Sequence, residues 1–164
     1  ELCNEMEKID YLFVAVSTCG TLAGTSQKIK EQFPNCKIVA VDIVGSQIFE
    51  QSNRKKHISG IGTGLIPQNL VHAKYDDYMI IDEVDAISEC NKLLTKGIVV
   101  GASSGAVAYA IQNYTGYSND LEYRKIVGIF PDRGERYLDT IYDKEWCKKI
   151  DTGILNVVQP IKQS

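Results

Sequence analysis

Several features that define whole classes of protein are absent from this 164-residue sequence. No apolar run reaches the roughly 18 residues of a membrane-spanning helix, and no basic leader precedes an apolar segment. The 18 basic and 21 acidic side chains leave a formal charge of −3, so the surplus of positive charge that nucleic acid or an anionic membrane attracts is missing. We therefore expect a cytoplasmic protein that binds neither nucleic acid nor a membrane.

Clustered metal ligands are also missing. The five cysteines are scattered and include no C-x-x-C pair, whereas zinc sites and disulfide frameworks need close or paired spacing. His57 and His72 are the only histidines, and neither has a partner at the spacing of metal ligands. We expect reduced thiols, no metal, and surface or loop positions for both histidines.

Short apolar runs alternate with amphipathic ones along the chain. The run at 11–16 is continuously apolar and of strand length, as in a strand buried on both faces. Strands that alternate with helices favour parallel pairing with right-handed crossovers. The sequence therefore predicts an α/β fold, a three-layer, mostly parallel twisted sheet with helices on both faces. The expected strands are 11–16, 37–42, 79–81, 98–100 and 126–130, and the expected helices are 22–33, 83–94, 103–114 and 136–150.

Two turns between a strand and a helix carry small polar side chains, where ligands of parallel sheets bind. Ser17 to Thr21 reads Ser-Thr-Cys-Gly-Thr and suits a phosphate or carboxylate at a helix start, although a simple N-cap is an equal alternative. Gly101 to Gly105 has the G-x-S-x-G pattern of a hydrolase nucleophile elbow. That reading needs a histidine after Ser103, and both histidines precede it. A polar ligand contact by Ser103 at the helix start is favoured over the elbow, and tight packing by small residues is the alternative.

The glycine-rich segment 60–64 lies in the irregular part of the sequence, residues 44–76. It lacks a complete G-x-G-x-x-G pattern because position 65 is Leu, so it is a weak dinucleotide signal. A loop that another group approaches closely is the better interpretation. The short basic run 53–57 stands in an acidic chain and favours a solvated loop over a binding patch.

Four segments in this order resemble the cysteine synthase family of fold-type II pyridoxal-phosphate enzymes. Residues 17–21 resemble its Gly-Thr-Gly-Gly-Thr phosphate loop, and residues 59–70 its Gly-Ile-Gly-x-Gly-Phe-Ile-Pro-x-Asn-Leu segment beside the substrate. Residues 101–106 match its Gly-Ile-Ser-Ser-Gly-Ala turn, and residues 130–138 its Pro-Ser-x-Gly-Glu-Arg-Tyr-Leu segment. Together the matches cover nearly the whole chain, which is far more specific than any one of them.

The resemblance implies a cofactor, pyridoxal 5′-phosphate, and a role for each segment. Ser17, Thr18, Cys19, Gly20 and Thr21 would hold its phosphate, and Pro131 would pack near it. Ser103 aligns with the residue that hydrogen-bonds the pyridine nitrogen, where a neutral hydroxyl in place of a carboxylate favours β-elimination over transamination. Gly62 and Thr63 would border the substrate.

Departures from the family pattern indicate a branch. Pro131 is followed by Asp-Arg-Gly-Glu-Arg-Tyr-Leu-Asp, and residues 17 and 19 are not glycine. This combination is similar to the siderophore-pathway branch that makes a 2,3-diaminopropionate precursor. That branch is expected to join O-phospho-L-serine to L-glutamate, giving N-(2-amino-2-carboxyethyl)-L-glutamate. Arg133 is either a clamp for a carboxylate or phosphate, or a surface ion-pair partner.

The family's Schiff-base lysine and substrate-carboxylate loop have no counterpart in the sequence. We therefore expect residues 1–164 to be the C-terminal, cofactor-binding portion of a two-domain enzyme that the family implies is a homodimer, and to be inactive alone. A cysteine synthase acting on O-acetylserine or O-phosphoserine with sulfide is the main alternative. A non-catalytic binding module and the α/β-hydrolase are less favoured alternatives.

Overall fold

A four-stranded parallel sheet organises the protein, seen in a computed structural model that describes residues 2–50, 55–117 and 123–149. The strands run in the order β3-β2-β1-β4. Tyr11 of the central strand β1 pairs with Lys37 of β2 on one side and Ile126 of β4 on the other. The strand bounds are β1 Tyr11–Ala15, β2 Lys37–Ile43, β3 Asp77–Ile81 and β4 Ile126–Gly128.

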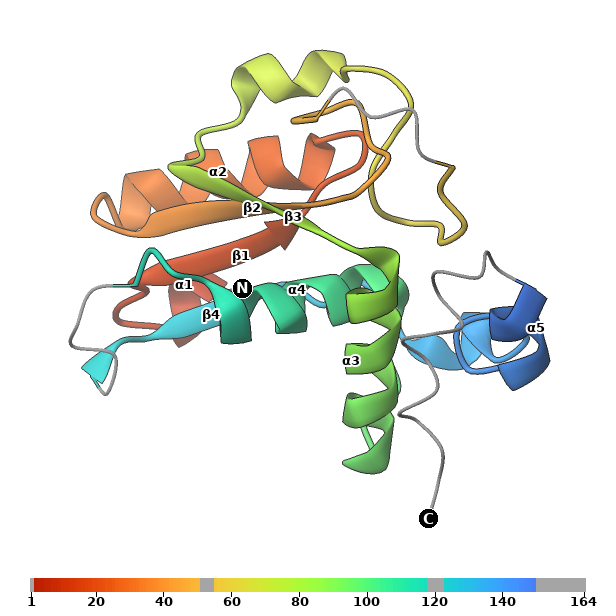
Figure 1. Ribbon diagram of the computed structural model, residues 1–164. Helices are drawn as coiled ribbons and strands as arrows, with labels where there is room; N and C mark the ends of the chain where they lie inside the picture. The colour runs from red at the N-terminus through yellow and green to blue at the C-terminus, as the bar shows by residue number, and fades with distance from the viewer. Residues whose placement is uncertain (1, 51–54, 118–122, 150–164) are drawn as a thin grey trace.

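Helices cover both faces of this sheet, which confirms the predicted fold class. Figure 1 shows α2 above the sheet and α3 and α4 below it. Alternate residues of β1 divide between the two cores: Leu12 packs with Leu22 and Ile29 of α2, while Phe13 packs with Val107 of α4. The helices are α1 Leu2–Glu5, α2 Gly20–Gln32, α3 Glu83–Thr95, α4 Ala102–Asn113 and α5 Lys144–Lys149, with the 3₁₀ turns η1 Gln68–His72 and η3 Gly134–Tyr137.

The start of α3 and its packing on α4 follow from local chemistry. Asp82 is the N-cap of α3, and its side chain accepts a hydrogen bond from the Val84 N–H at 3.3 Å. Gly105 lets the two helices touch, because a Cβ at that position would lie 2.3 Å from the carbonyl oxygen of Ala86 and 2.4 Å from Cys90 Sγ. Any larger residue at 105 would push α4 off α3.

Two predicted elements were wrong. Residues 98–100 form no strand of the sheet; Val100 makes one antiparallel bridge with Arg133, and its N–H and C=O both bond the Tyr142 hydroxyl. The expected helix 136–150 is instead divided into η3, a turn and the helix α5. Asp143, the residue before α5, accepts a hydrogen bond from the Trp146 N–H at 2.5 Å. β4 is shorter than expected and ends at Gly128. Residue 150 lies outside the described residues.

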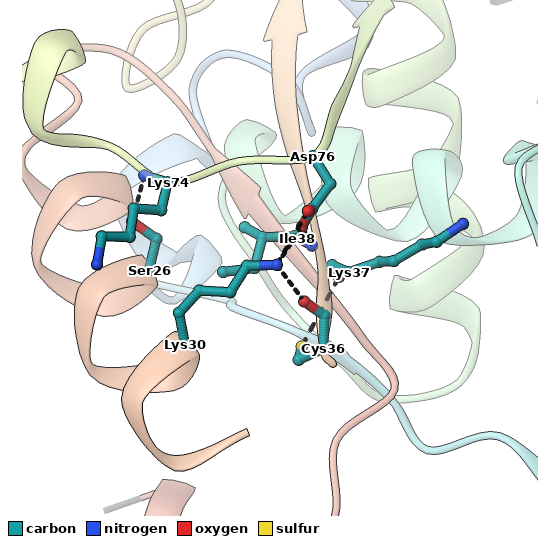
Figure 2. Close-up of polar contacts among 7 residues, drawn as sticks. All are labelled: Ser26, Lys30, Cys36, Lys37, Ile38, Lys74 and Asp76. Carbon is teal, nitrogen blue, oxygen red and sulfur yellow. Dashed lines mark hydrogen bonds and ion pairs between the residues drawn. The ribbon is translucent and has the colours of Figure 1, made fainter. Parts of the chain in front are cut away.

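At the amino end of the sheet, a lysine joins α2 to β2 (Figure 2). Lys30 Nζ donates to the Cys36 carbonyl at 2.7 Å and to both carboxylate oxygens of Asp76 at 2.9 and 2.8 Å. Asp76 also accepts from the Ile38 N–H at 2.7 Å. These bonds fix the register of α2 on the sheet, and through it the loop at the other end of the helix.

The entry to β1 is fixed in a similar way by Asp10. Burial alone would raise the pKa of Asp10, but the Lys125 N–H and the Lys8 and Arg124 side chains together hold that pKa below its ordinary value. The ion pairs measure 3.0 Å to Lys8 and 3.1 Å to Arg124, and the Lys125 N–H lies 2.9 Å from the carboxylate. Asp10 thereby ties β1 to the segment that enters β4.

Among the described residues, no helix combines the length and apolar character needed to cross a membrane.

Candidate functional site

A cavity of about 300 Å³ opens where β1 ends. The three turns singled out in the sequence all reach it, together with the segment that follows β4. For loop 17–21 and the segment after β4 this position follows from the topology, since the carboxyl ends of parallel strands meet at one edge of the sheet. The turn 101–105 and the glycine-rich segment reach the cavity although no strand of the sheet directly precedes them. The lining residues are Val14, Ala15, Ser17, Thr18, Thr21, Gly60, Ser103, Ile129 and Pro131.

The loop 17–21 presents hydroxyls to this cavity at the start of α2. Cys19 occupies the left-handed region at φ 59° and ψ 7°, and its carbonyl accepts the Ala23 N–H at 2.9 Å to begin the helix. Gly20 leaves the approach open, because a Cβ there would meet no atom closer than 3.7 Å. Unpaired N–H groups at a helix start and nearby hydroxyls are the groups that bind a phosphate dianion.

Cys19 is turned away from the cavity. The residue is 2% exposed and packs in the core beneath α2. Burial, reinforced by the charge of Asp42, raises the pKa of its thiol to about 11. Cys19 therefore belongs to the backbone of the loop rather than to its reactive surface.

The glycine-rich segment lies directly against loop 17–21. The Gly62 N–H donates to the Val16 carbonyl at 2.6 Å, and the Ser17 hydroxyl donates to the Gly62 carbonyl at 3.1 Å. Gly62 is at φ 67°, and a Cβ there would lie 2.6 Å from Ile43 Cγ2. Gly60 lines the cavity, whereas Gly62 and Thr63 lie behind it and anchor the segment.

Lys56 also holds this segment, a role that the sequence interpretation missed. Its ammonium donates to the Ile61 carbonyl at 2.7 Å and to the Gly62 carbonyl at 3.0 Å. Its charge partly offsets the burial that raises the pKa of Asp42, a residue with no exposed surface at the end of β2. In the sequence, a lysine a few residues before a glycine-rich segment was the feature that could have indicated this contact.

Ser103 stands at the first turn of α4 on the opposite wall. The residue is 4% exposed, and within the described chain its hydroxyl makes no hydrogen bond. Ser104 beside it is fully buried, and its hydroxyl does not reach the cavity. The neighbouring Gly101 makes room for Asp132, because a Cβ at 101 would lie 2.2 Å from Asp132 Oδ1.

The segment after β4 brings only part of the predicted set to the cavity. Pro131 lines it. Asp132 turns inward and accepts the Tyr137 hydroxyl at 2.5 Å, a bond that together with burial raises the pKa of Tyr137. Arg133 does not line the cavity; its side chain is 86% exposed and pairs with Glu135 at 2.8 Å.

The chemistry of the cavity is therefore polar but neutral. One end offers hydroxyls and helix N–H groups for an anion, and the other offers the unpaired hydroxyl of Ser103. No carboxylate and no amine belongs to the lining found among the described residues. Groups of this kind suit a phosphorylated molecule, and the lining found among the described residues includes no amine that would attach one covalently.

Comparisons with known proteins agree with this arrangement. Residues 1–132 match the family described as pyridoxal-phosphate dependent enzyme. The chain is 39% identical over 152 residues to an N-(2-amino-2-carboxyethyl)-L-glutamate synthase of Cupriavidus metallidurans, covering 91% of this chain and 44% of the relative. It is 39% identical over 142 residues to the protein of the same name from Ralstonia nicotianae, covering 86% and 41%. The chain thus spans less than half the length of these relatives.

Solved structures show the same fold. An O-acetylserine dependent cystathionine beta-synthase from Helicobacter pylori superimposes with a TM-score of 0.77 at 29% identity, covering 87% of this chain and 47% of that one. A hydrogen sulfide-producing enzyme from Fusobacterium nucleatum gives 0.72 at 32% identity, covering 94% and 47%. With residues 1–132 matched, which is most of its length, the chain belongs to the pyridoxal-phosphate dependent enzyme family.

Proposed function

We propose that this chain is the cofactor-binding portion of an enzyme that joins O-phospho-L-serine to L-glutamate, giving N-(2-amino-2-carboxyethyl)-L-glutamate. The glutamate amine forms a new C–N bond to the serine Cβ, the Cβ–O bond breaks, and phosphate leaves with the electron pair. The amine loses a proton. The bound cofactor supplies the electron sink that makes this replacement possible.

The hydroxyls of Thr18 and Thr21 and the N–H groups at the start of α2 would hold the cofactor phosphate. The Ser17 hydroxyl, which donates to the Gly62 carbonyl, would have to exchange that bond to join them. Cys19 and Gly20 would contribute through the backbone, since the Cys19 side chain is buried elsewhere. Pro131 would pack against the cofactor from the segment after β4. A cavity of about 300 Å³ with an anion-binding end suits one such molecule.

The observation that carries the proposal is the unpaired Ser103 hydroxyl in the same cavity as the phosphate-binding loop. A hydroxyl next to the pyridine nitrogen is neutral and does not keep that nitrogen protonated, as a carboxylate would. No carboxylate lines the described cavity to take that place. This environment favours elimination and replacement at the β-carbon over transamination.

The substrates are proposed on two supports: the names of the relatives that are 39% identical and the Asp-Arg-Gly-Glu-Arg-Tyr-Leu segment that follows Pro131. Gly62 and Thr63 would border the substrate by setting the position of Gly60. Arg133 remains a predicted clamp, and to reach a ligand it would have to leave Glu135.

The Schiff-base lysine would come from a separate N-terminal domain, and we expect a homodimer, as the family resemblance implies. A chimaera in which this chain replaces the matching segment of the Cupriavidus metallidurans synthase tests the proposal. The chimaera should release phosphate from O-phospho-L-serine and form the glutamate adduct, detected by mass spectrometry. The chain alone should show no turnover; product above background would contradict the need for a second domain.

Ser103→Ala and Ser104→Ala form a matched pair for the cofactor site. Both remove one buried hydroxyl from the same turn of α4, but only Ser103 lines the cavity. In the chimaera, Ser103→Ala should lower the rate of adduct formation and shift the absorbance of the bound cofactor. Ser104→Ala should leave both unchanged. Equal effects of the two substitutions would show that Ser103 does not have the role assigned to it.

A cysteine synthase is the second candidate, and the solved structures favour it. The similar proteins include one named as O-acetylserine dependent and one named as hydrogen sulfide-producing. Assays of the chimaera with sulfide and with glutamate, each with O-acetylserine and with O-phospho-L-serine, separate the candidates. Cysteine formation without a glutamate adduct would replace the proposed reaction by this one.

A further inference from the structure

A second, smaller cavity of about 150 Å³ lies behind the first. Two pairs of consecutive residues separate them. Ser59 lines the second cavity and Gly60 the first, while Ala102 lines the second and Ser103 the first. Two short stretches of backbone therefore form a common wall between the two cavities.

Polar side chains line the second cavity. Arg136 and His57 line it together with the hydroxyl residues Ser59, Tyr137 and Thr140. No carboxylate belongs to the lining found among the described residues. The Tyr137 and Thr140 hydroxyls already donate, to Asp132 and to the Tyr137 carbonyl. The guanidinium of Arg136 is therefore the group that suits this cavity to an anion.

Arg136 is available to such an anion. Three residues earlier, Arg133 is paired with Glu135 at 2.8 Å. Arg136 forms no ion pair within the part of the chain that the structure describes. A guanidinium binds a carboxylate or phosphate through two parallel N–H bonds, which an ammonium does not provide.

His57 is held in place by Glu83 from outside the cavity. Glu83 accepts from the His57 N–H at 2.6 Å, from the Ile58 N–H at 2.8 Å and contacts His57 Nδ1 at 2.9 Å. These bonds occupy the Glu83 carboxylate and fix the orientation of the imidazole. His57 lies in a loop, as expected, but the expectation did not include this support.

We infer that the second cavity binds the side-chain anion of an acidic amino acid, with Arg136 as the principal contact. Its volume is half that of the first cavity and well below the roughly 300–1,000 Å³ of pockets for drug-sized ligands, so the ligand is small. The choice of an amino acid rests on the proposed function, whose two substrates, O-phospho-L-serine and L-glutamate, both end in an anion. Carboxylate and phosphate share the chemistry that a guanidinium recognises.

Trp146 makes the test direct, because it is the single tryptophan of the sequence and lines this cavity. The 164-residue chain, without cofactor, is titrated with each acidic amino acid while its tryptophan fluorescence is recorded. L-Glutamine and L-serine serve as neutral counterparts. We expect a saturable change with at least one acidic amino acid and none with the neutral ones, and the tighter of L-glutamate and O-phospho-L-serine identifies the ligand.

Arg136→Gln should weaken that binding by about tenfold or more, the typical effect of losing a charged hydrogen-bond donor. Lys28→Gln is the control, since it removes the same charge from an exposed pair with Glu31 on α2. Thermal unfolding of each variant verifies that the fold is retained. Equal weakening by both substitutions, or no saturable change with either acidic amino acid, would overturn the inference.

The result is separable from the proposed function. Cofactor binding to the same chain is followed by ³¹P NMR of the cofactor phosphate. Glutamate or phosphoserine binding that depends on Arg136 supports the second cavity even where the chimaera makes no adduct. If the adduct forms equally well with Arg136→Gln and neither acidic amino acid binds to the chain, the proposed reaction stands and the inference about the second cavity is wrong.

Discussion

Gly62 is the position where a single methyl group should disturb the site most. At φ 67°, a residue with a side chain costs about 1–2 kcal/mol more than glycine. The added Cβ would lie 2.6 Å from Ile43 Cγ2 and 3.0 Å from Ser46 Cβ. Both atoms are close to the backbone and have little freedom to move. Overpacking of this kind costs about 1–3 kcal/mol. Gly62→Ala should therefore lower the free energy of unfolding by about 2–5 kcal/mol.

Urea unfolding of the chain, followed by Trp146 fluorescence, measures this loss. At about 2–4 °C per kcal/mol for a chain of this size, the melting temperature should fall by roughly 4–20 °C. Gly64→Ala is the matched control in the same segment, because no atom lies within 4 Å of a Cβ there. The Gly64 variant should stay within about 0.5 kcal/mol of the parent.

A functional loss should accompany the structural one. Gly62 bonds Val16 through its N–H, and its carbonyl accepts from Ser17 and Lys56. Moving the segment would pull the Ser17 hydroxyl away from the cavity and weaken cofactor binding. Stability of Gly62→Ala within about 0.5 kcal/mol of the parent, with unchanged cofactor affinity, would refute the reasoning.

Three further predictions concern the frame around the site. Asp76→Asn removes the carboxylate that binds Lys30 and should cost about 1–2 kcal/mol in urea unfolding, a value reduced because the Asp76 side chain is 37% exposed. Asp10 has a lowered pKa, so its contribution is present at neutral pH and is lost as pH falls below about 4; Asp10→Asn should lower stability at pH 7 and make the acid-induced loss shallower. Cys3 should react with iodoacetamide first in the folded chain, by mass spectrometry. The thiols whose pKa burial raises to about 11 or 12 should react only after unfolding: Cys19, Cys36 and Cys90.

The elements that local patterns specify could be predicted from the sequence. The continuous apolar runs at 11–16 and 37–42 predicted the two central strands, because a strand covered by helices on both faces carries apolar side chains on both. Asp82, a residue type that favours the N-cap position, caps its helix. The positions of loop 17–21 and of the segment after β4 followed from parallel topology, since each leaves the carboxyl end of a strand. The turn 101–105 follows no strand of the sheet, so that rule does not account for its place at the cavity.

Two of the errors have a related cause: a side chain satisfies backbone groups that the local pattern assigned elsewhere. The residues 98–100 have the composition of a strand, but the Tyr142 hydroxyl takes both polar groups of Val100. Lys56 sits in a basic run typical of a solvated loop, yet its ammonium is committed to the carbonyls of Ile61 and Gly62. Neither bond leaves a trace in the periodicity of the sequence.

Cys19 shows how the site combines local cost with long-range gain. Its left-handed conformation explains why the resembling phosphate loops carry glycine at this position, and a cysteine there costs about 1–2 kcal/mol of backbone strain. The Cys19 side chain is 2% exposed, and its packing beneath α2 offsets part of this strain. The strain is local to the turn, but the packing ties the turn to the helix whose N–H groups face the cavity. A residue that does not touch the ligand therefore helps to hold the ligand-binding backbone in position.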